Sequence, residues 1–166
     1  MSSRAFVLPP GGGRSVWSLG GRFTEKLSGE LVDGRFSMVE VLARRAAEPP
    51  RHIHHREDEL WYVVDGQMTF HVGDDVLPAP AGAFAFAPRG VAHAFTIDVE
   101  PTRVLILATP SGFERFAMEL GVDAVGDDEP AGLTLPGPEV LGPAAARYDI
   151  EIVGPPIRAG GAPAGS

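Results

Sequence analysis

The sequence lacks cysteine altogether, contains lysine only at Lys26, and has no apolar run long enough to cross a membrane. Without cysteine, the protein can form no disulfide, no cysteine-ligated zinc site and no thiol nucleophile. Its net charge of −8 argues against a nucleic-acid-binding protein, which needs a basic surface. Apolar runs such as Val104–Ala108 are only strand-sized. Because Met1–Arg4 also lacks the apolar core of a signal peptide, we expect a cytoplasmic protein that binds neither nucleic acid nor membrane.

Glycine and proline are abundant instead, with 21 and 16 residues among 166. The hydrophobic residues, 44% of the chain, still suffice for the core of one domain. The glycine and proline excess is concentrated toward the two ends of the chain. We therefore divide the chain into a flexible lead, a β domain, a helical C-terminal extension and a flexible tail. Their expected bounds are 1–13, 14–110, 111–153 and 154–166.

Short alternating segments, separated by turn residues, fill the region between residues 15 and 109. Segments 60–64 and 67–72 flank Asp65-Gly66, a dipeptide typical of two-residue hairpins. Many short strands with few helical intervals predict an all-β, antiparallel sandwich or barrel. The other expected strands are 36–42, 83–87, 93–97 and 103–108.

Helical patterns occur only near the C-terminus. Residues 111–120 place Ser111 at the N-cap and Glu114 at the matching capping-box position, and Gly121 ends the helix. A second, weaker helix is predicted over residues 138–147, with an interruption at Gly142-Pro143. The fold class is therefore all-β with one or two C-terminal helices.

Three histidines and one glutamate have the spacing of a metal site. His52 and His54 are two residues apart, so in an extended strand their side chains point to the same face. Glu59 and His93 each stand at the head of a further predicted strand. Three imidazoles and one carboxylate suit one divalent Fe, Ni, Mn, Co or Zn ion and leave coordination positions for substrate or water. Their sequence does not distinguish among these metals.

Two motifs carry a resemblance to a known family. His52-x-His54-x4-Glu59-x6-Gly66 and Gly82-x5-Pro88-x-Gly90-x2-His93 closely resemble the two motifs of the cupin superfamily. The resemblance covers roughly residues 35–110 and implies a small antiparallel β-barrel, the double-stranded β-helix or jelly roll. It also implies that the metal is held inside by the three histidines and the glutamate. Two positions depart from the family pattern, namely Ala46 in place of glycine and Ile97 in place of asparagine.

The chain is more narrowly similar to single-domain cupins of the quercetin 2,3-dioxygenase-like group. This likeness rests on residues 49–59, 113–116 and 150–156. It implies a dioxygenase that uses O2 on a polyphenolic, flavonol-like or related enol substrate, with Glu59 as both ligand and general base. Two alternatives stay open: a non-redox isomerase, cyclase or lyase acting on a polyketide-like molecule, and a metal-dependent ligand-binding cupin without turnover.

Side-chain alternation also predicts a substrate pocket. If Glu59 and His93 point inward, the residues two and four positions beyond them do so too. On an earlier strand, we expect one face that includes Glu40 to point inward as well. Such a pocket favours a flat or apolar, aromatic substrate over a sugar phosphate, with only Arg89 or Arg103 placed to meet an anion. The predicted pocket residues are Phe36, Met38, Trp61, Val63, Phe95 and Ile97.

The remaining polar residues near the motifs are expected to be peripheral. His55 has the wrong parity to join the ligands, and His71 lies on a strand face with no predicted role. Glu57 and Asp58 are expected on a solvated acidic edge, although either could orient a ligand. Because small barrels have open sheet edges and cupins are often dimers, we also expect a homodimer, with Val16–Glu30 as the candidate pairing edge.

Overall fold

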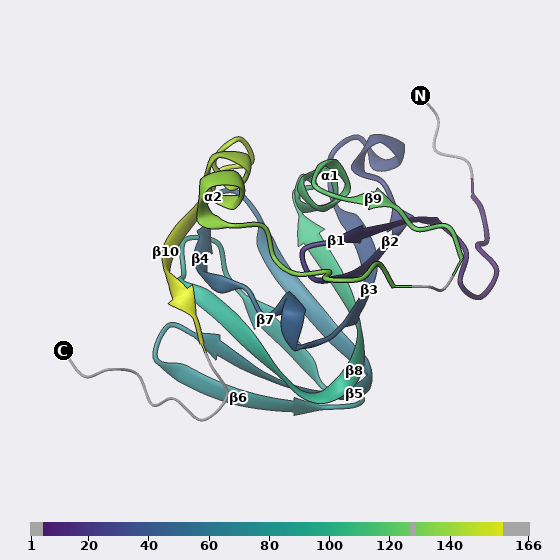
Figure 1. Ribbon diagram of the computed structural model, residues 1–166. Coiled ribbons are helices and arrows are strands. Elements are labelled where there is room, and N and C mark those ends of the chain that lie inside the picture. Colours follow the sequence, from purple (N-terminus) through teal and green to yellow (C-terminus); the bar gives the residue numbers. More distant parts are fainter. Residues whose placement is uncertain (1–4, 127–128, 158–166) are drawn as a thin grey trace.

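The computed structural model describes residues 5–126 and 129–157 of the chain. These residues form an antiparallel sheet of ten strands that curls around an interior, with two α-helices over one end (Figure 1). The prediction of an all-β fold with one or two C-terminal helices is confirmed, and two are present. Parts of the expected flexible ends, 1–4 and 158–166, lie outside the described residues. The strands are β1 (Arg14–Ser18), β2 (Gly21–Leu27), β3 (Ser37–Ala43), β4 (Pro50–His54), β5 (Asp58–Val72), β6 (Asp75–Pro80), β7 (Phe84–Ala87), β8 (His93–Thr109), β9 (Val122–Asp123) and β10 (Ile150–Pro156).

The strand order brings distant parts of the sequence together. The sheet runs β10-β4-β8-β3-β2-β1-β9, and β5 pairs with β8 as well as with β6 and β7. The β4–β8 junction is a single residue pair, His52 opposite His93. Two short 3-10 helices, η1 (Gly29–Val32) and η2 (Arg45–Ala47), lie in the connections. This topology places the two halves of the predicted metal motif next to each other.

The predicted hairpin at Asp65-Gly66 is wrong, because β5 continues through it as one strand of 15 residues. The pairing of β5 with β8 shifts register on both sides of Asp65, which marks a bulge. Gly66 has a φ of 86°, and a Cβ there would lie 2.3 Å from the Thr102 hydroxyl oxygen. The chain instead reverses at the end of β5, between Val72 and Asp75, which pair across the β5–β6 turn.

The bulge changes which residues of β5 point inward. Before it, Glu59, Trp61 and Val63 are buried; after it, Met68 and Phe70 are buried. The odd-numbered residues therefore face the interior in one half of the strand and the even-numbered residues in the other.

The expectation that Phe36, Met38 and Glu40 point inward is also wrong. The buried residues of β3 are Ser37, Val39, Val41 and Ala43, whereas Met38 and Glu40 are only half-buried. In the β3–β8 register, Val41 lies opposite Val104, which belongs to the inner face of β8. Both faces of β3 carry apolar side chains, so alternation alone did not identify the inner one.

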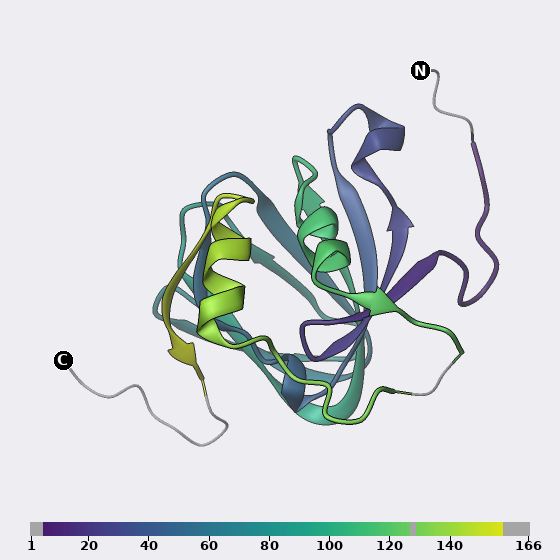
Figure 2. The ribbon, with the colours of Figure 1, turned by 45° about the horizontal axis from the view of Figure 1, so that its top comes forward.

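Two helices, α1 (Phe113–Glu119) and α2 (Pro138–Ala146), lie at the same end of the curled sheet (Figures 1 and 2). Helix α1 contacts β1, β2 and β3, and α2 contacts β10. The predicted cap is wrong in detail: the N-cap is Gly112, whose N–H donates to the Glu114 carboxylate at 2.7 Å. Helix α2 runs through Gly142 and Pro143 without the expected interruption. Among the described residues, neither helix is long and apolar enough to span a membrane.

Candidate metal centre

The structure brings together all four predicted metal ligands. His52 and His54 come from β4, Glu59 from β5 and His93 from β8, and one donor atom of each lies within 4.8 Å of the others. Glu59 Oε2 is 3.0 Å from His93 Nε2 and 3.3 Å from His54 Nε2. The His52 and His93 rings have centroids 4.4 Å apart. The cluster is therefore compact enough to surround one ion.

Each of the three imidazoles is held by a hydrogen bond at its Nδ1 atom. His52 Nδ1–H donates to the Pro50 carbonyl at 2.8 Å, and His93 Nδ1–H donates to the Val91 carbonyl at 2.9 Å. His54 Nδ1–H donates instead to the Glu57 carboxylate at 3.3 Å. Each Nδ1 is thus occupied, and each Nε2 is left for the centre of the cluster.

Burial and mutual proximity shift the titration of these groups. Burial, reinforced by the neighbouring His93 and His54, lowers the pKa of His52 to about 3. Burial alone would raise the pKa of Glu59, but the imidazoles of His54 and His93 outweigh it and lower this pKa to about 2. For His54, burial lowers the pKa, yet Glu59 and Glu57 together raise it above its ordinary value.

The donor set fits a transition-metal ion. Three nitrogens and one carboxylate oxygen are the ligand types that Fe, Ni, Mn, Co and Zn accept. His54 Nε2 is buried and faces Glu59 Oε2 at 3.3 Å, but it makes no hydrogen bond among the described residues. A buried imidazole nitrogen without a hydrogen bond costs stability unless a ligand satisfies it. This nitrogen and the three fixed rings together fit an ion at this position.

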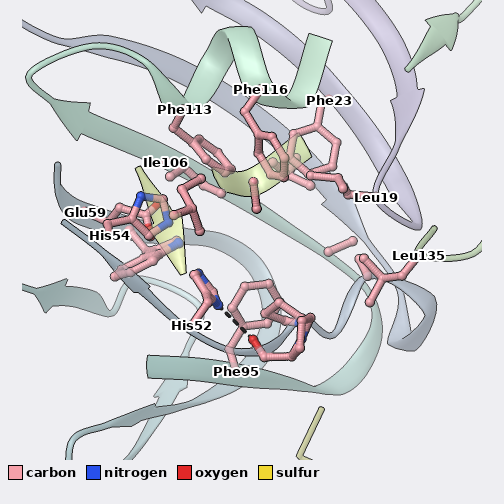
Figure 3. A pocket seen from close by; sticks show the side chains of 18 of the residues that line it. Leu19, Phe23, His52, His54, Glu59, Phe95, Ile106, Phe113, Phe116 and Leu135 are labelled. Carbon is pink, nitrogen blue, oxygen red and sulfur yellow. Dashed lines mark hydrogen bonds and ion pairs between the residues drawn. The ribbon is translucent and has the colours of Figure 1, made fainter. Parts of the chain in front are cut away.

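The cluster forms one end of an apolar cavity with a volume of about 70 Å³. Figure 3 shows His52, His54 and Glu59 on one side with Phe113 beside them, and Phe116 and Leu135 farther across the space. Except for those three ligands, every lining residue is apolar. The apolar lining residues are Leu19, Phe23, Val41, Ala43, Ala47, Pro49, Pro50, Trp61, Met68, Phe95, Val104, Ile106, Phe113, Phe116, Leu135, Leu141, Ala145, Ile150 and Ile152.

The predicted pocket residues divide into three groups. Trp61 and Phe95 line the cavity. Val63 and Ile97 are fully buried but belong to the core and not to the cavity wall. Phe36 and Met38 do not line it, because β3 turns its other face inward.

The helix side of this wall was not predicted from the sequence. For Phe113 and Phe116 the sequence predicts only a helix over residues 111–120, yet the Phe113 ring lies 5.9 Å from the His54 ring. Nothing local in the sequence of α1 indicates which strand ends it will cover. The packing of α1 against β1–β3 determines this position.

Of the polar residues expected to lie away from the site, Glu57 was predicted wrongly. His55 is exposed and pairs with Glu151 at 2.8 Å, and Asp58 pairs with Arg89 at 2.7 Å. Arg89 and Arg103 are both exposed and do not line the cavity. Glu57, expected on a solvated edge, is 1% exposed and holds the His54 ring. The bend at His55-Arg56 folds Glu57 back onto the ring. In the sequence, only its position three residues after His54 indicated that Glu57 could contact this histidine.

Comparisons with known proteins agree with this architecture. Residues 38–108 match the family model Cupin_2, described as a cupin domain. The quercetin 2,3-dioxygenase of Bacillus subtilis (strain 168) is 27% identical over 90 residues, which are 54% of this chain and 27% of that enzyme. The chain thus spans about a quarter of the length of this curated relative.

Two solved structures share the fold. KdgF from Halomonas sp. superposes with a TM-score of 0.56 at 19% identity, over 65% of this chain and 94% of that one. The polyketide cyclase RemF from Streptomyces resistomycificus superposes with a TM-score of 0.54 at 20% identity, over 65% and 81% of the two chains. The predicted jelly-roll fold is therefore confirmed by residues well beyond the two motifs.

Proposed function

We propose that the chain is a metal-dependent enzyme of the cupin superfamily, specifically a dioxygenase acting on a polyphenolic, flavonol-like or related enol substrate, because residues 38–108 match the cupin domain model. The observation that carries this proposal is the position of the four-ligand cluster at the end of an apolar cavity. The local similarity to a quercetin 2,3-dioxygenase supports the choice of substrate class.

His52, His54, Glu59 and His93 would hold one divalent transition-metal ion. When bound, such an ion supplies Lewis-acid chemistry and, if it is redox-active, the electron transfer that activation of O2 requires. Glu59 is the residue placed for proton transfer, because its carboxylate lies in the cavity wall beside His54 and His93. In this role it accepts the hydroxyl proton of a bound enol or phenol.

The cavity wall supports an aromatic substrate. No arginine or lysine lines the cavity, so a phosphate group would find no counter-charge there. Trp61, Phe95 and Phe113 present ring surfaces beside the ligand cluster. Since the open space holds only a few water molecules, a flavonol must displace side chains of the helical wall when it binds.

The second candidate is a non-redox isomerase, cyclase or lyase acting on a polyketide-like molecule. Its support is that the same ligand set also suits Zn, which is redox-inactive. One protein with this fold is a polyketide cyclase, so the fold itself does not select between redox and non-redox chemistry. A third candidate, a metal-dependent ligand-binding protein, would use the same cavity without turnover.

A screen of oxygen uptake separates these candidates. Protein reconstituted with Fe, Ni, Mn, Co or Zn is incubated with flavonols, catechols and polyketide-like enols, in air and without oxygen. Oxygen consumption that is lost in Glu59→Gln supports the dioxygenase, and product formed without oxygen supports the second candidate. Ligand-induced thermal stabilisation without product indicates a binding protein. If no metal supports oxygen uptake with any flavonol, the flavonol dioxygenase proposal is wrong.

The expected homodimer also stays a proposal, and the structure favours a different surface for it. Part of the β1 edge within Val16–Glu30 is already paired with β9. Aromatic residues are exposed on the outer face of β5 and β7, where Phe84 (62% exposed) lies opposite Tyr62 (47% exposed) in the register. Exposed apolar patches of this kind mark interfaces. Sedimentation of the wild type and of Phe84→Ser tests the dimer, and cell fractionation tests the cytoplasmic location.

A further inference from the structure

Glu57 is a buried carboxylate beside the ligand cluster, and its burial is not explained by the four ligands alone. Glu57 is 1% exposed, and its carboxylate accepts the His54 Nδ1–H at 3.3 Å. A carboxylate is costly to bury unless it has specific partners. His52 and His93 use backbone carbonyls for the same purpose, which require no buried charge. The exception at His54 therefore needs a reason.

The reason lies in the local backbone. His52 and His93 each donate to the carbonyl two residues earlier, at Pro50 and at Val91. The Nδ1 of His54 instead points toward the turn at residues 55–57, where the side chain of Glu57 folds back onto it. The carboxylate thus takes the place that a carbonyl has at the other two histidines.

The surroundings of Glu57 are shaped to hold it. A Cβ at Gly112 would lie 2.3 Å from Glu57 Oε1, so only glycine leaves room for this carboxylate. Gly112 is itself fixed, because its N–H donates to Glu114 at 2.7 Å. Glu114 is equally buried and accepts a second N–H from Gly29 at 3.3 Å. Glu57 is thereby confined between the His54 ring and the start of α1.

We propose that Glu57 is a positioning residue that fixes the His54 ring with Nε2 directed to the metal, and that Gly112 keeps Glu57 in place. This inference rests on the proposed metal site. His54 Nε2 faces Glu59 Oε2 at 3.3 Å but makes no hydrogen bond among the described residues, so the hydrogen bond at Nδ1 is what fixes the ring. Outer partners of this type typically contribute 10- to 100-fold to metal affinity.

Three variants and one matched control test the proposal. Glu57→Leu removes the acceptor, Glu57→Gln keeps an oxygen acceptor but removes the charge, and Gly112→Ala leaves Glu57 intact but displaces it. Thr102→Val is the control, because Thr102 is as buried as Glu57 but bonds only to Gln67 and Val99, away from the ligand cluster. Affinity for Co(II) is measured by competition with a chelator, and thermal unfolding of each metal-free variant is measured in parallel.

We expect the affinity for Co(II) to fall by about 10- to 100-fold in Glu57→Leu and in Gly112→Ala, and by less in Glu57→Gln. Thr102→Val should lose thermal stability but retain the affinity for Co(II). The proposal is overturned if folded Glu57→Leu binds Co(II) as tightly as the wild type. It is also overturned if Thr102→Val loses as much affinity as Glu57→Leu.

A measurement on the metal-free protein separates this inference from the metal site itself. Nitrogen-15 NMR at alkaline pH, where the imidazole is neutral, reports which nitrogen of His54 carries the proton. We expect the Nδ1–H tautomer in the wild type and a mixture in Glu57→Leu. If the wild type binds no metal but has this tautomer, the metal site is wrong and the positioning of His54 stands. If the wild type has the other tautomer, the positioning role is wrong.

Discussion

The two ends of the cavity are built from different kinds of structure. The ligand end consists of residues on β4, β5 and β8, which are tied by strand pairing and by hydrogen bonds to each ring. The opposite end consists of side chains from α1, α2 and the segment before α2, such as Phe116, Leu141 and Leu135. The ligand end lies within the matched cupin domain, and the opposite end lies outside it.

This difference separates two tasks. Strands hold the ligands with little freedom, which suits a site that must present four donor atoms to one point. Helices and loops can vary in sequence without disturbing the sheet, so they are the natural place for substrate selection. We therefore expect changes at the two ends of the cavity to have separable effects.

The largest effect is expected at the ligand end. His93→Ala removes a donor that is 3.0 Å from Glu59 Oε2, and it should lower metal affinity by more than about 100-fold, because loss of an outer partner alone costs 10- to 100-fold. Elemental analysis and chelator competition measure this loss. His55→Ala is the control, since His55 is exposed and should bind metal like the wild type. Normal metal content in His93→Ala would contradict the ligand assignment.

A smaller effect, on substrate binding and not on metal affinity, is expected at the helix end. Phe113→Ala removes a ring that lies 5.9 Å from the His54 ring, and it should weaken quercetin binding by up to about tenfold, the size of one aromatic contact. Metal affinity should be unchanged, because Phe113 donates nothing to the cluster. Calorimetric titration with quercetin, alongside chelator competition, measures both. A loss of metal without a loss of quercetin binding would reverse the division of tasks.

Burial of the ligand end should make the stability of the metal-free protein depend moderately on pH. The pKa of His52 is lowered to about 3, so below its ordinary pKa of 6.5 the unfolded chain binds a proton that the folded protein refuses. The metal-free protein should therefore lose stability as the pH falls from about 6.5 toward 3. The lowered pKa of Glu59 acts in the same direction below its ordinary value of 4.5.

His54 acts in the opposite direction, because its raised pKa contributes stability that is present below 6.5 and is lost as the pH rises through the raised value. Denaturant unfolding of metal-free protein between pH 7 and 4 measures the acid loss, and His52→Gln should reduce it. An equally steep loss in His52→Gln would assign it to other groups.

The smallest effect is expected at the exposed rim beside the ligands. Asp58 is adjacent to Glu59 in the sequence but pairs on the surface with Arg89 at 2.7 Å. Exposed ion pairs contribute little to stability, so Asp58→Asn should leave metal affinity unchanged and the unfolding midpoint nearly so. Chelator competition and thermal unfolding measure these quantities. A clear loss of metal in Asp58→Asn would extend the ligand end to the molecular surface.

The sequence was sufficient for the features that depend on short spacing. His52 and His54 share a face because strands alternate, and the two-motif pattern placed Glu59 and His93 beside them. It was insufficient where a distant residue decides. Glu57 is buried because Gly112, far along the chain, leaves room for it, and no local pattern reveals that. Asp65-Gly66 has the composition of a hairpin turn, but the pairing of β5 with β8 uses it as a bulge.

That bulge makes the length of β5 as important as its composition. Glu59 and Trp61 face inward at odd positions, whereas Met68 and Phe70 face inward at even ones, so the inward alternation of β5 shifts by one residue at the bulge. Deleting a single residue at 65 or 66 would keep every metal ligand but turn Met68, which lines the cavity, and Phe70 toward solvent. Homologues should therefore vary freely in the identity of residue 65, while insertions and deletions between Glu59 and Met68 should be absent.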